Sequence, residues 1–548
     1  MEQPLSVLPS SAASPTAVLA LVAVVAIVAV NHLVASRRST PELSRRRRRR
    51  RLPPGPASLP VIGHLHLLRL PVHRTFHELA ARYGPLMRIR LGSTNCVVVT
   101  SAEVAAELFR GHEAAVSGRP LAAVSRQFGY GAAGIVFSPC TPYWRFMRRL
   151  CMSELLGPRT VEQLRPVRDA GVAALLRAAR AAAAAGGEVN LTREIVRLSN
   201  TAIVRMMARD APEGVTEEAQ ELVKDVTELS GAFNLDDHIA LCRGWDLQGL
   251  RRSAAAVHRR FDALLEEMIR HKKEARKRTA GGAAVKQHQK DTTAAAVATG
   301  EGSRDLLDIL LDKAEDETAE VKLTMDNIKA FMIDMVTAGS DTAAATVEWM
   351  LAELINHPDA MRKVREEIDA AVGGGRVVGE ADLPRLPYLQ AAYKETLRLH
   401  PAVPVVPRES AGEEFAVRGF AVPPRTVVFL HVWAMGRDPA SWEDAAAFAP
   451  ERFMPGGAAA GVEPRGQSFQ FLPFGAGRRT CPGMGLALQS VPAVLAALVQ
   501  CFDWATGAGD GDGDGAVDME EGHGLVCARK HPLVLRPAVR LSPFPAVA

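Results

Sequence analysis

Cysteine is scarce in this sequence, and no two cysteines stand at a paired spacing. The 548 residues contain 7 cysteines, an odd number, with no Cys-x-x-Cys pair. A disulfide-held scaffold is therefore excluded, and we expect a body that stays in a reducing compartment. With 47% hydrophobic and 23% charged residues, the composition is that of a packed globular chain of enzyme size.

The sequence also lacks an excess of positive charge outside its amino terminus. The first 51 residues carry nine arginines and two acidic residues, so the overall charge of +5 leaves about −2 for the other 497 residues. A basic domain surface is missing, and nucleic acid is therefore not an expected partner.

No lysine or arginine precedes the long apolar run near the amino terminus. This run, residues 17–35, is interrupted only by Asn31 and His32, and as a helix it spans roughly 28 Å, enough to cross a bilayer. Arginines follow it, including the unbroken run 45–51, which places the downstream chain in the cytosol. A cleaved signal peptide is the alternative, but its positive charge is expected before the apolar run. We predict a membrane anchor at 1–36, a basic and proline-rich linker at 37–56, and one catalytic domain at 57–548.

Long Ala/Leu/Glu/Arg-rich segments with helical spacing dominate the body. Short β-like runs, such as 96–100 and 426–430, are scattered among them. The predicted fold class is therefore mainly α with a minor β portion. Two stretches, 279–303 and 505–515, have the composition of surface insertions.

Two motif matches are contradicted by their context. Residues 510–521 fit the spacing of a calcium-binding EF-hand loop, but they lie in an Asp-Gly repeat with no amphipathic helix entering it. Residues 129–134 fit a dinucleotide-binding fingerprint, but no helix follows the glycines directly. We interpret both as loops.

One cysteine stands apart from the others. Cys481 lies in the glycine-rich loop 474–483, beside two arginines and just before a helical run that starts near Met484. Cationic neighbours and free N–H groups at a helix start both lower the pKa of a thiol, so a thiolate is expected here. A buried structural thiol is the alternative. A lone cysteine cannot form a zinc site, and no protease pattern surrounds it, which leaves a thiolate that binds haem iron axially.

The loop reads Phe-x-x-Gly-x-Arg-x-Cys-x-Gly, and it resembles the signature of the haem-thiolate monooxygenases, the cytochrome P-450 superfamily. Three further matches follow the family's order: residues 338–342, 394–398 and 448–453. The resemblance covers the chain from Leu52 to about Pro537. It implies the cytochrome P-450 fold after one transmembrane helix, with Cys481 as the axial ligand of the iron.

The resemblance also implies roles for the other matched residues. Thr342 would hold the bound oxygen molecule and a water, and Asp341 would relay protons. The alternative for Thr342 is a hydroxyl that bonds back to its own helix. Glu395, Arg398 and Arg452 would form a structural charge network under the haem, whereas an isolated Glu-x-x-Arg pair is usually a solvated surface pair.

The implied cofactor is haem b (iron protoporphyrin IX). Six residues besides Cys481 are implied to contact the haem, and the tryptophan and the three arginines among them would meet the propionates. The six are Trp144, Arg148, Arg408, Phe474, Arg479 and Gly483. No flavin or nicotinamide motif is convincing in this chain, so NADPH is expected to act only through an NADPH-cytochrome reductase. Together with the anchor, this implies a single-pass protein of the endoplasmic reticulum membrane. Pro492 departs from the family pattern, and we expect it to kink or shorten the helix after Cys481.

The expected substrate is a small apolar or phenolic molecule. The predicted pocket walls are 119–137, 229–237, the helix before Gly339, and 402–406. Segments such as 231–236, 245–249, 351–355 and 386–390 resemble the plant flavone synthases type II and flavanone 2-hydroxylases, which implies a flavanone oxidised at C2 in flavonoid biosynthesis. Related isoflavonoid-forming enzymes tend to carry lysine where this chain has Pro407. Another plant metabolite, an isoflavonoid or a triterpene, and a non-catalytic membrane haem-binding protein are the alternatives.

Overall fold

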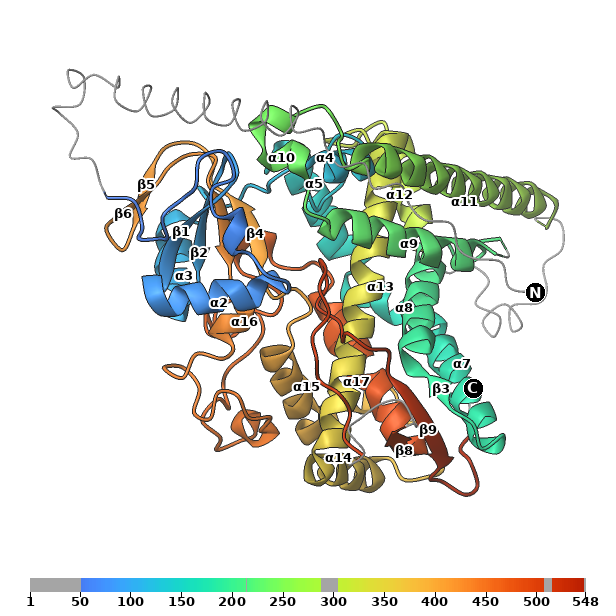
Figure 1. Cartoon of the computed structure of the whole chain (residues 1–548). Coiled ribbons are helices and arrows are strands. Elements are labelled where there is room, and N and C mark those ends of the chain that lie inside the picture. The colour runs from blue at the N-terminus through green and yellow to red at the C-terminus, as the bar shows by residue number, and fades with distance from the viewer. Residues whose placement is uncertain (1–50, 213, 287–303, 507–514, 547–548) are drawn as a thin grey trace, which may run out of the picture.

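The computed structural model describes residues 51–212, 214–286, 304–506 and 515–546 (Figure 1). The predicted anchor and residues 37–50 of the linker lie outside the described residues. The helices are α2 (Val72–Tyr83), α3 (Ala102–His112), α4 (Ala123–Phe128), α5 (Pro142–Leu150), α6 (Pro158–Gln163), α7 (Arg165–Ala184), α8 (Leu191–Met207), α9 (Val215–Gly231), α10 (Leu235–His238), α11 (Leu250–Lys286), α12 (Leu306–Glu315), α13 (Met325–Asn356), α14 (Pro358–Ala371), α15 (Pro387–Leu399), α16 (Val432–Met435) and α17 (Met484–Cys501). The strands are β1 (Leu86–Leu91), β2 (Thr94–Val99), β3 (Val189–Asn190), β4 (Val406–Glu409), β5 (Phe415–Val417), β6 (Phe420–Val422), β7 (Val427–Leu430), β8 (Phe502–Thr506) and β9 (Val534–Val539). The prediction of a mainly α chain with a minor β portion is confirmed for these residues.

The largest sheet of the described chain has the order β1-β2-β7-β4. The two predicted strands, 96–100 and 426–430, are its parallel neighbours β2 and β7. Alternate residues of β2 pack on opposite faces: Val97 and Val99 lie in one hydrophobic cluster, and Cys96 and Val98 lie in another. The sheet is therefore buried on both sides and forms a rigid wall beside the helical part (Figure 1).

Helix α13 runs through the helical part and packs against α8, α9 and α17 (Figure 1). A reciprocal capping box starts it, in which Thr324 Oγ1 accepts from the Asn327 N–H and Asn327 Oδ1 accepts from the Thr324 N–H. The apolar run 331–354 lies inside it. This helix carries the matched residues 338–342 across the middle of the molecule.

Helix α17 continues through Pro492 to Cys501. We expected this proline to kink or shorten the helix. The shortening is wrong, because residues 493–501 are all buried and tertiary packing outweighs the hydrogen bond that proline cannot donate. Among the described residues it is the one helix long and apolar enough to span a membrane, and 67% of it is buried inside the protein. We interpret it as a core helix.

Candidate active site

The loop before α17 presents the Cys481 thiol to a cavity of about 740 Å³. The Cys481 N–H donates to the Phe474 carbonyl at 2.9 Å, which closes the loop on itself. Gly477 has φ +66°, and a Cβ there would come within 2.7 Å of a Glu113 carboxylate oxygen, so glycine is required. Phe474 and Gly483 line the same cavity as the thiol.

We expected the surroundings of Cys481 to favour a thiolate. For the protein without its cofactor this expectation is wrong. Burial raises the pKa of the Cys481 thiol, and this effect exceeds the opposing influence of the Gly483 and Met484 N–H groups and of Arg148 and Arg119. The sequence showed the cations but not the depth of burial. A coordinating metal ion deprotonates a thiol outright, so the donor itself suits iron.

Arg408 shows that the cavity needs an anionic occupant. Its side chain is 1% exposed, and Nη2 donates to the Ala476 carbonyl at 3.2 Å. Its Nε and Nη1 have no hydrogen-bond partner among the described residues. Burial and the nearby Arg119 and Arg479 hold the pKa of Arg408 well below its usual range.

Arg119 is a second cation of this cavity, half-buried, and the sequence predicted it only as part of the substrate wall. Its Nη1 donates to the Pro407 carbonyl at 2.6 Å, whereas its Nε has no partner within the described chain. Burial lowers the pKa of Arg119 to about 10. Arginine in the loop Gly118-Arg119-Pro120 is a weak signal, because only the fold brings it beside Cys481.

Trp144 and Arg479 form one stacked unit beside these cations. The Arg479 guanidinium lies 4.3 Å from the Trp144 ring centroid and donates to the Ser117 carbonyl at 2.9 Å. Trp144 Nε1 donates to the Ile135 carbonyl at 3.0 Å. Because these donors already have backbone partners, Arg119, Arg148 and Arg408 are the better placed to bind the anionic groups of a cofactor.

These donors fit haem. One thiol faces a cavity that is large and mostly apolar, and the unpartnered guanidinium nitrogens of Arg408 and Arg119 match the two carboxylates of a porphyrin. Cys481 would hold the iron, and the arginines would hold the propionates. The group would supply redox chemistry with molecular oxygen.

The side chains of Thr342 and Asp341 have different surroundings. Thr342 lines the cavity, and its hydroxyl donates to the Ala338 carbonyl at 2.7 Å. The hydroxyl therefore bonds back to its own helix, which was the alternative to an oxygen-binding role. Its oxygen can still accept a hydrogen bond from the cavity side. Asp341 is not among the described residues that line the cavity; its Oδ2 accepts from the Thr227 hydroxyl of α9 at 2.9 Å.

Thr337 is the exception among the hydroxyls of α13. Ser340, Thr342 and Thr346 each donate to the carbonyl four residues earlier, at 2.7, 2.7 and 2.8 Å. The buried Thr337 hydroxyl has no partner in the described part of the chain, and Thr337 lines the cavity. A buried hydroxyl without a partner is destabilising by about 1–3 kcal/mol, so this group is suited to bind a ligand. The sequence pattern gives no sign of it, since it depends on a side-chain rotamer.

Asp334 fixes the loop that covers the cavity. Its Oδ2 accepts from the N–H groups of Ile135 and Val136 at 2.6 and 3.0 Å. Gly134 allows this approach, because a Cβ there would lie 2.2 Å from Oδ2. Burial raises the pKa of Asp334 to about 6 against these two N–H donors. The glycine motif 129–134 is thus a loop, as interpreted, and it is held to α13.

The cavity walls differ in part from those predicted. Residues from 119–137, from α13 and from 402–406 line it as expected. The α9 wall consists of Val226, Thr227 and Ser230, and of these three Ser230 lies in the predicted range 229–237. Phe233 is 40% exposed. Residues 525–526, near the carboxyl terminus, also line the cavity and were not predicted.

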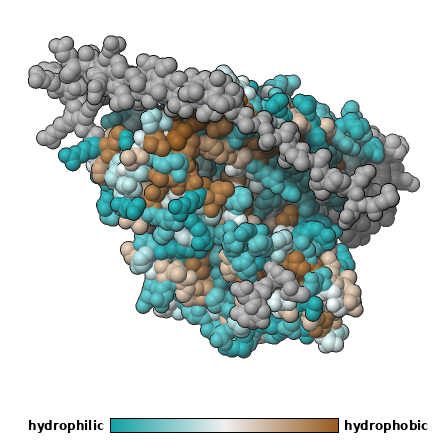
Figure 2. All heavy atoms as spheres, in the orientation of Figure 1, coloured by the Kyte–Doolittle hydropathy of each residue, from teal (hydrophilic) through white to brown (hydrophobic). Residues whose placement is uncertain are grey.

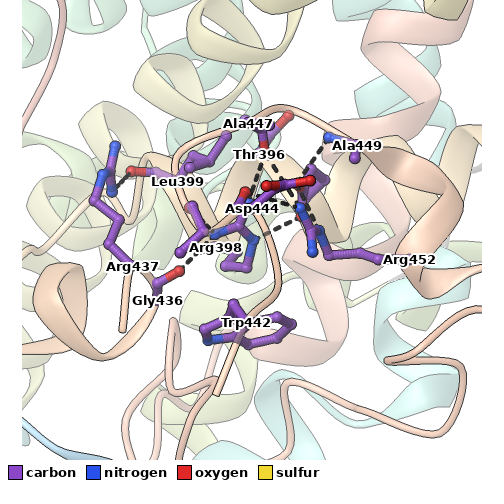
Figure 3. Close-up of polar contacts among 12 residues, drawn as sticks. Thr396, Arg398, Leu399, Gly436, Arg437, Trp442, Asp444, Ala447, Ala449 and Arg452 are labelled. Atoms are coloured by element: carbon purple, nitrogen blue, oxygen red, sulfur yellow. Dashed lines mark hydrogen bonds and ion pairs between the residues drawn. The ribbon is translucent and has the colours of Figure 1, made fainter. Parts of the chain in front are cut away.

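Glu395 joins two arginines, Arg398 and Arg452, in a buried network; both arginines are labelled in Figure 3. Arg398 donates to both of its oxygens at 2.6 and 2.7 Å, and Arg452 Nε donates to Oε1 at 2.9 Å. Both members of the Glu395–Arg398 pair are 0% exposed, which excludes a solvated surface pair. The Arg398 guanidinium also donates to the Gly436 carbonyl at 2.6 Å and lies over the Trp442 ring (Figure 3).

Glu521, the last position of the discounted calcium motif, has other partners. Its carboxylate accepts from Arg74 at 2.7 Å and from Trp433 at 2.8 Å, and it pairs with His73 at 2.9 Å. Residues 510–514 of that motif lie outside the described residues.

The fold, the thiol and the cationic cavity together define a haem-thiolate monooxygenase. The chain matches the family described as Cytochrome P450 over residues 53–531. Cytochrome P450 93G1 from Oryza sativa subsp. japonica is 68% identical over 497 residues, which cover 91% of this chain and 92% of the relative. The 3,9-dihydroxypterocarpan 6A-monooxygenase of Glycine max is 42% identical over 511 residues, covering 92% and 96%. A solved zebra fish cytochrome P450 with progesterone has a TM-score of 0.68 at 22% identity, covering 86% of this chain and 100% of that one, and it supports the fold.

The chain belongs to the cytochrome P450 family. It is a monooxygenase that uses haem b and receives electrons through a reductase.

Proposed function

We propose that this monooxygenase oxidises a flavanone at C2. Flavanone, O2, NADPH and a proton give 2-hydroxyflavanone, NADP⁺ and water, and loss of a second water from the product gives the flavone. The electrons pass from NADPH through the reductase. The observation that carries the proposal is the apolar cavity over Cys481 with the unpartnered Thr337 hydroxyl in its wall.

A hydroxylated polycyclic substrate suits this wall. The apolar lining favours flat rings, and Thr337 offers both a donor and an acceptor to a phenolic hydroxyl or a ketone. Thr337 and Thr342 are five residues apart, about 7.5 Å along the helix axis, so a polar group near Thr337 leaves the carbon to be oxidised near Thr342. The Glycine max relative is named for a dihydroxylated pterocarpan, which supports this class of substrate.

The chain's own residues then have distinct roles. Arg119, Arg148 and Arg408 hold the cofactor carboxylates, and Cys481 holds the iron. Thr342 holds a water at the cavity wall, and Asp341 moves a proton towards it. Asp334 keeps the loop 134–137 closed over the cavity, which excludes bulk water.

Reconstitution of the full chain with haem, NADPH-cytochrome reductase and naringenin tests the proposal. We expect NADPH consumption that depends on naringenin and a product that has gained one oxygen atom or lost two hydrogens. The Thr337→Val variant should raise the KM for naringenin about tenfold, and Thr337→Ser should restore it. Haem incorporation without any naringenin product would reject the proposal.

A related phenolic substrate is the second candidate. The unpartnered Thr337 hydroxyl favours it over a triterpene, which has no phenolic hydroxyl to bind there. Turnover of a pterocarpan, with none of naringenin, would select this candidate.

We also propose that the protein lies on the endoplasmic reticulum membrane through more than its predicted anchor. We define an apolar face from the exposed large hydrophobic residues of two segments, 52–70 and 233–247: Leu52, Leu59, Ile62, Leu70, Phe233, Leu241, Trp245 and Leu247. The segments are joined through the β1–β2 turn, where the Ser93 N–H donates to the His238 carbonyl at 2.7 Å. Figure 2 shows apolar residues gathered on the upper part of the view. A lipid surface suits such a face, since Trp245 is 73% exposed and Leu70 is 68% exposed.

A further inference from the structure

Thr227 connects the cavity to Asp341. Thr227 lies on α9 and lines the cavity, whereas Asp341 lies on α13 and is not among the described lining residues. The Thr227 hydroxyl donates to Asp341 Oδ2 at 2.9 Å across the contact between the two helices. One hydroxyl therefore touches both the ligand space and the buried carboxylate.

The carboxylate depends on this contact. Burial raises the pKa of Asp341, and the hydrogen bond from Thr227 is what opposes that rise. Without the hydroxyl, a buried carboxyl is more often protonated and lacks a fixed orientation. A residue that relays protons needs both a defined charge state and a defined direction.

We propose that Thr227 is the positioning residue of Asp341 and ties proton delivery to occupancy of the cavity. A substrate that packs against α9 presses Thr227 onto α13 and keeps the Asp341 carboxylate in the orientation that this hydrogen bond defines. In an empty cavity α9 lacks that support, and the carboxylate is aligned less often. This inference rests on the proposed function only in assigning proton transfer to Asp341.

The main test measures how much product forms for each NADPH consumed by the reconstituted full chain. We expect Thr227→Val to lower this ratio about fivefold to tenfold, as Asp341→Asn does. The double variant should lower it no further, because the two residues act through one contact. Thr227→Ser should restore the ratio, and Glu228→Gln, at the next position of α9 but with an exposed side chain, should leave it unchanged.

A second measurement separates this inference from the proposed function. Infrared titration of the protein, with Asp341→Asn to identify the band, follows the Asp341 carboxyl without any turnover. We expect Thr227→Val to move its midpoint to higher pH, because the hydrogen bond that lowers the pKa of Asp341 is lost. If naringenin gives no product but this midpoint moves, the substrate proposal fails and the positioning role stands.

Two outcomes would overturn the inference. One is a Thr227→Val protein with the wild-type product ratio in a series where Asp341→Asn lowers it. The other is an Asp341 midpoint that Thr227→Val leaves in place.

Discussion

Individual buried cations determine what this cavity can hold. Arg408 and Arg119 are desolvated and keep guanidinium nitrogens without partners in the described chain. A buried charge without a counter-charge is strongly unfavourable. A cofactor with two carboxylates removes that penalty, so binding the cofactor and stabilising the fold are linked at these residues.

Loss of one such cation should weaken haem retention. We expect Arg408→Leu and Arg148→Leu to lower the haem-to-protein ratio of the purified protein at least severalfold. Arg145→Leu is the matched control, because Arg145 lies on the same helix as Arg148 and is exposed. Equal haem content in all three variants would show that the arginines do not bind the cofactor.

Spacing in the sequence predicted those residues whose role depends on a local motif. Cys481 stands in a glycine-rich loop, and Glu395 and Arg398 stand three apart on one helix, so their geometry follows from the chain itself. Thr337 and Arg119 could not be found in this way. Their importance arises from a rotamer and from burial, which depend on segments far away in the sequence.

A buried charge network holds helix α15 to the later segment that carries Arg452. Glu395 is the acceptor for Arg398 and Arg452, and all three side chains are at most 8% exposed. Removing the one acid leaves two cations buried beside each other. We therefore expect Glu395→Ala to lower the free energy of unfolding by about 3–5 kcal/mol.

Chemical denaturation followed by circular dichroism measures this loss. Glu366→Ala is the control, because Glu366 pairs with Arg362 at an exposed helix surface, where an ion pair is worth less than about 1 kcal/mol. Similar losses in the two variants would contradict a special role for the buried network.

The cavity loop should make stability depend on pH through Asp334. Its pKa is raised to about 6 in the folded protein, so its contribution is fully present below the unfolded pKa and is lost as pH rises through about 6. Relative to Asp334→Asn, the wild type should lose about 1 kcal/mol of unfolding free energy between pH 5 and pH 7.5. Denaturation curves at both pH values test this, and a difference between the two proteins that does not change with pH would contradict it.

Helices and strands were predicted well where the pattern lies in neighbouring residues. They were predicted less well where tertiary packing determines the structure. The strands 96–100 and 426–430 follow from β-branched runs, but their parallel pairing is a property of the fold. Pro492 predicted a kinked or shortened helix, but the helix continues to Cys501 because the residues after the proline are buried. On α9 the cavity lining begins at Val226, before the predicted range 229–237, because the fold determines which face of a helix turns inward.

The whole molecule combines a rigid sheet, a helical part around α13 and an apolar face that joins two distant segments. We expect Trp245 to lie in the lipid interface when the full chain is reconstituted in lipid nanodiscs. Brominated lipids should then quench part of the tryptophan fluorescence, and that part should be absent in Trp245→Phe. Equal quenching in both proteins would place this face in water.

The most direct measurement is the absorption spectrum of the reduced, carbon monoxide-bound full chain. A sulfur ligand from Cys481 predicts the red-shifted Soret band of haem-thiolate proteins in the wild type and in Cys140→Ser, which changes another thiol near the arginines. Cys481→His should bind haem without that band. A wild-type protein that binds haem but lacks the red-shifted band, or a Cys481→His protein that keeps it, would contradict the account.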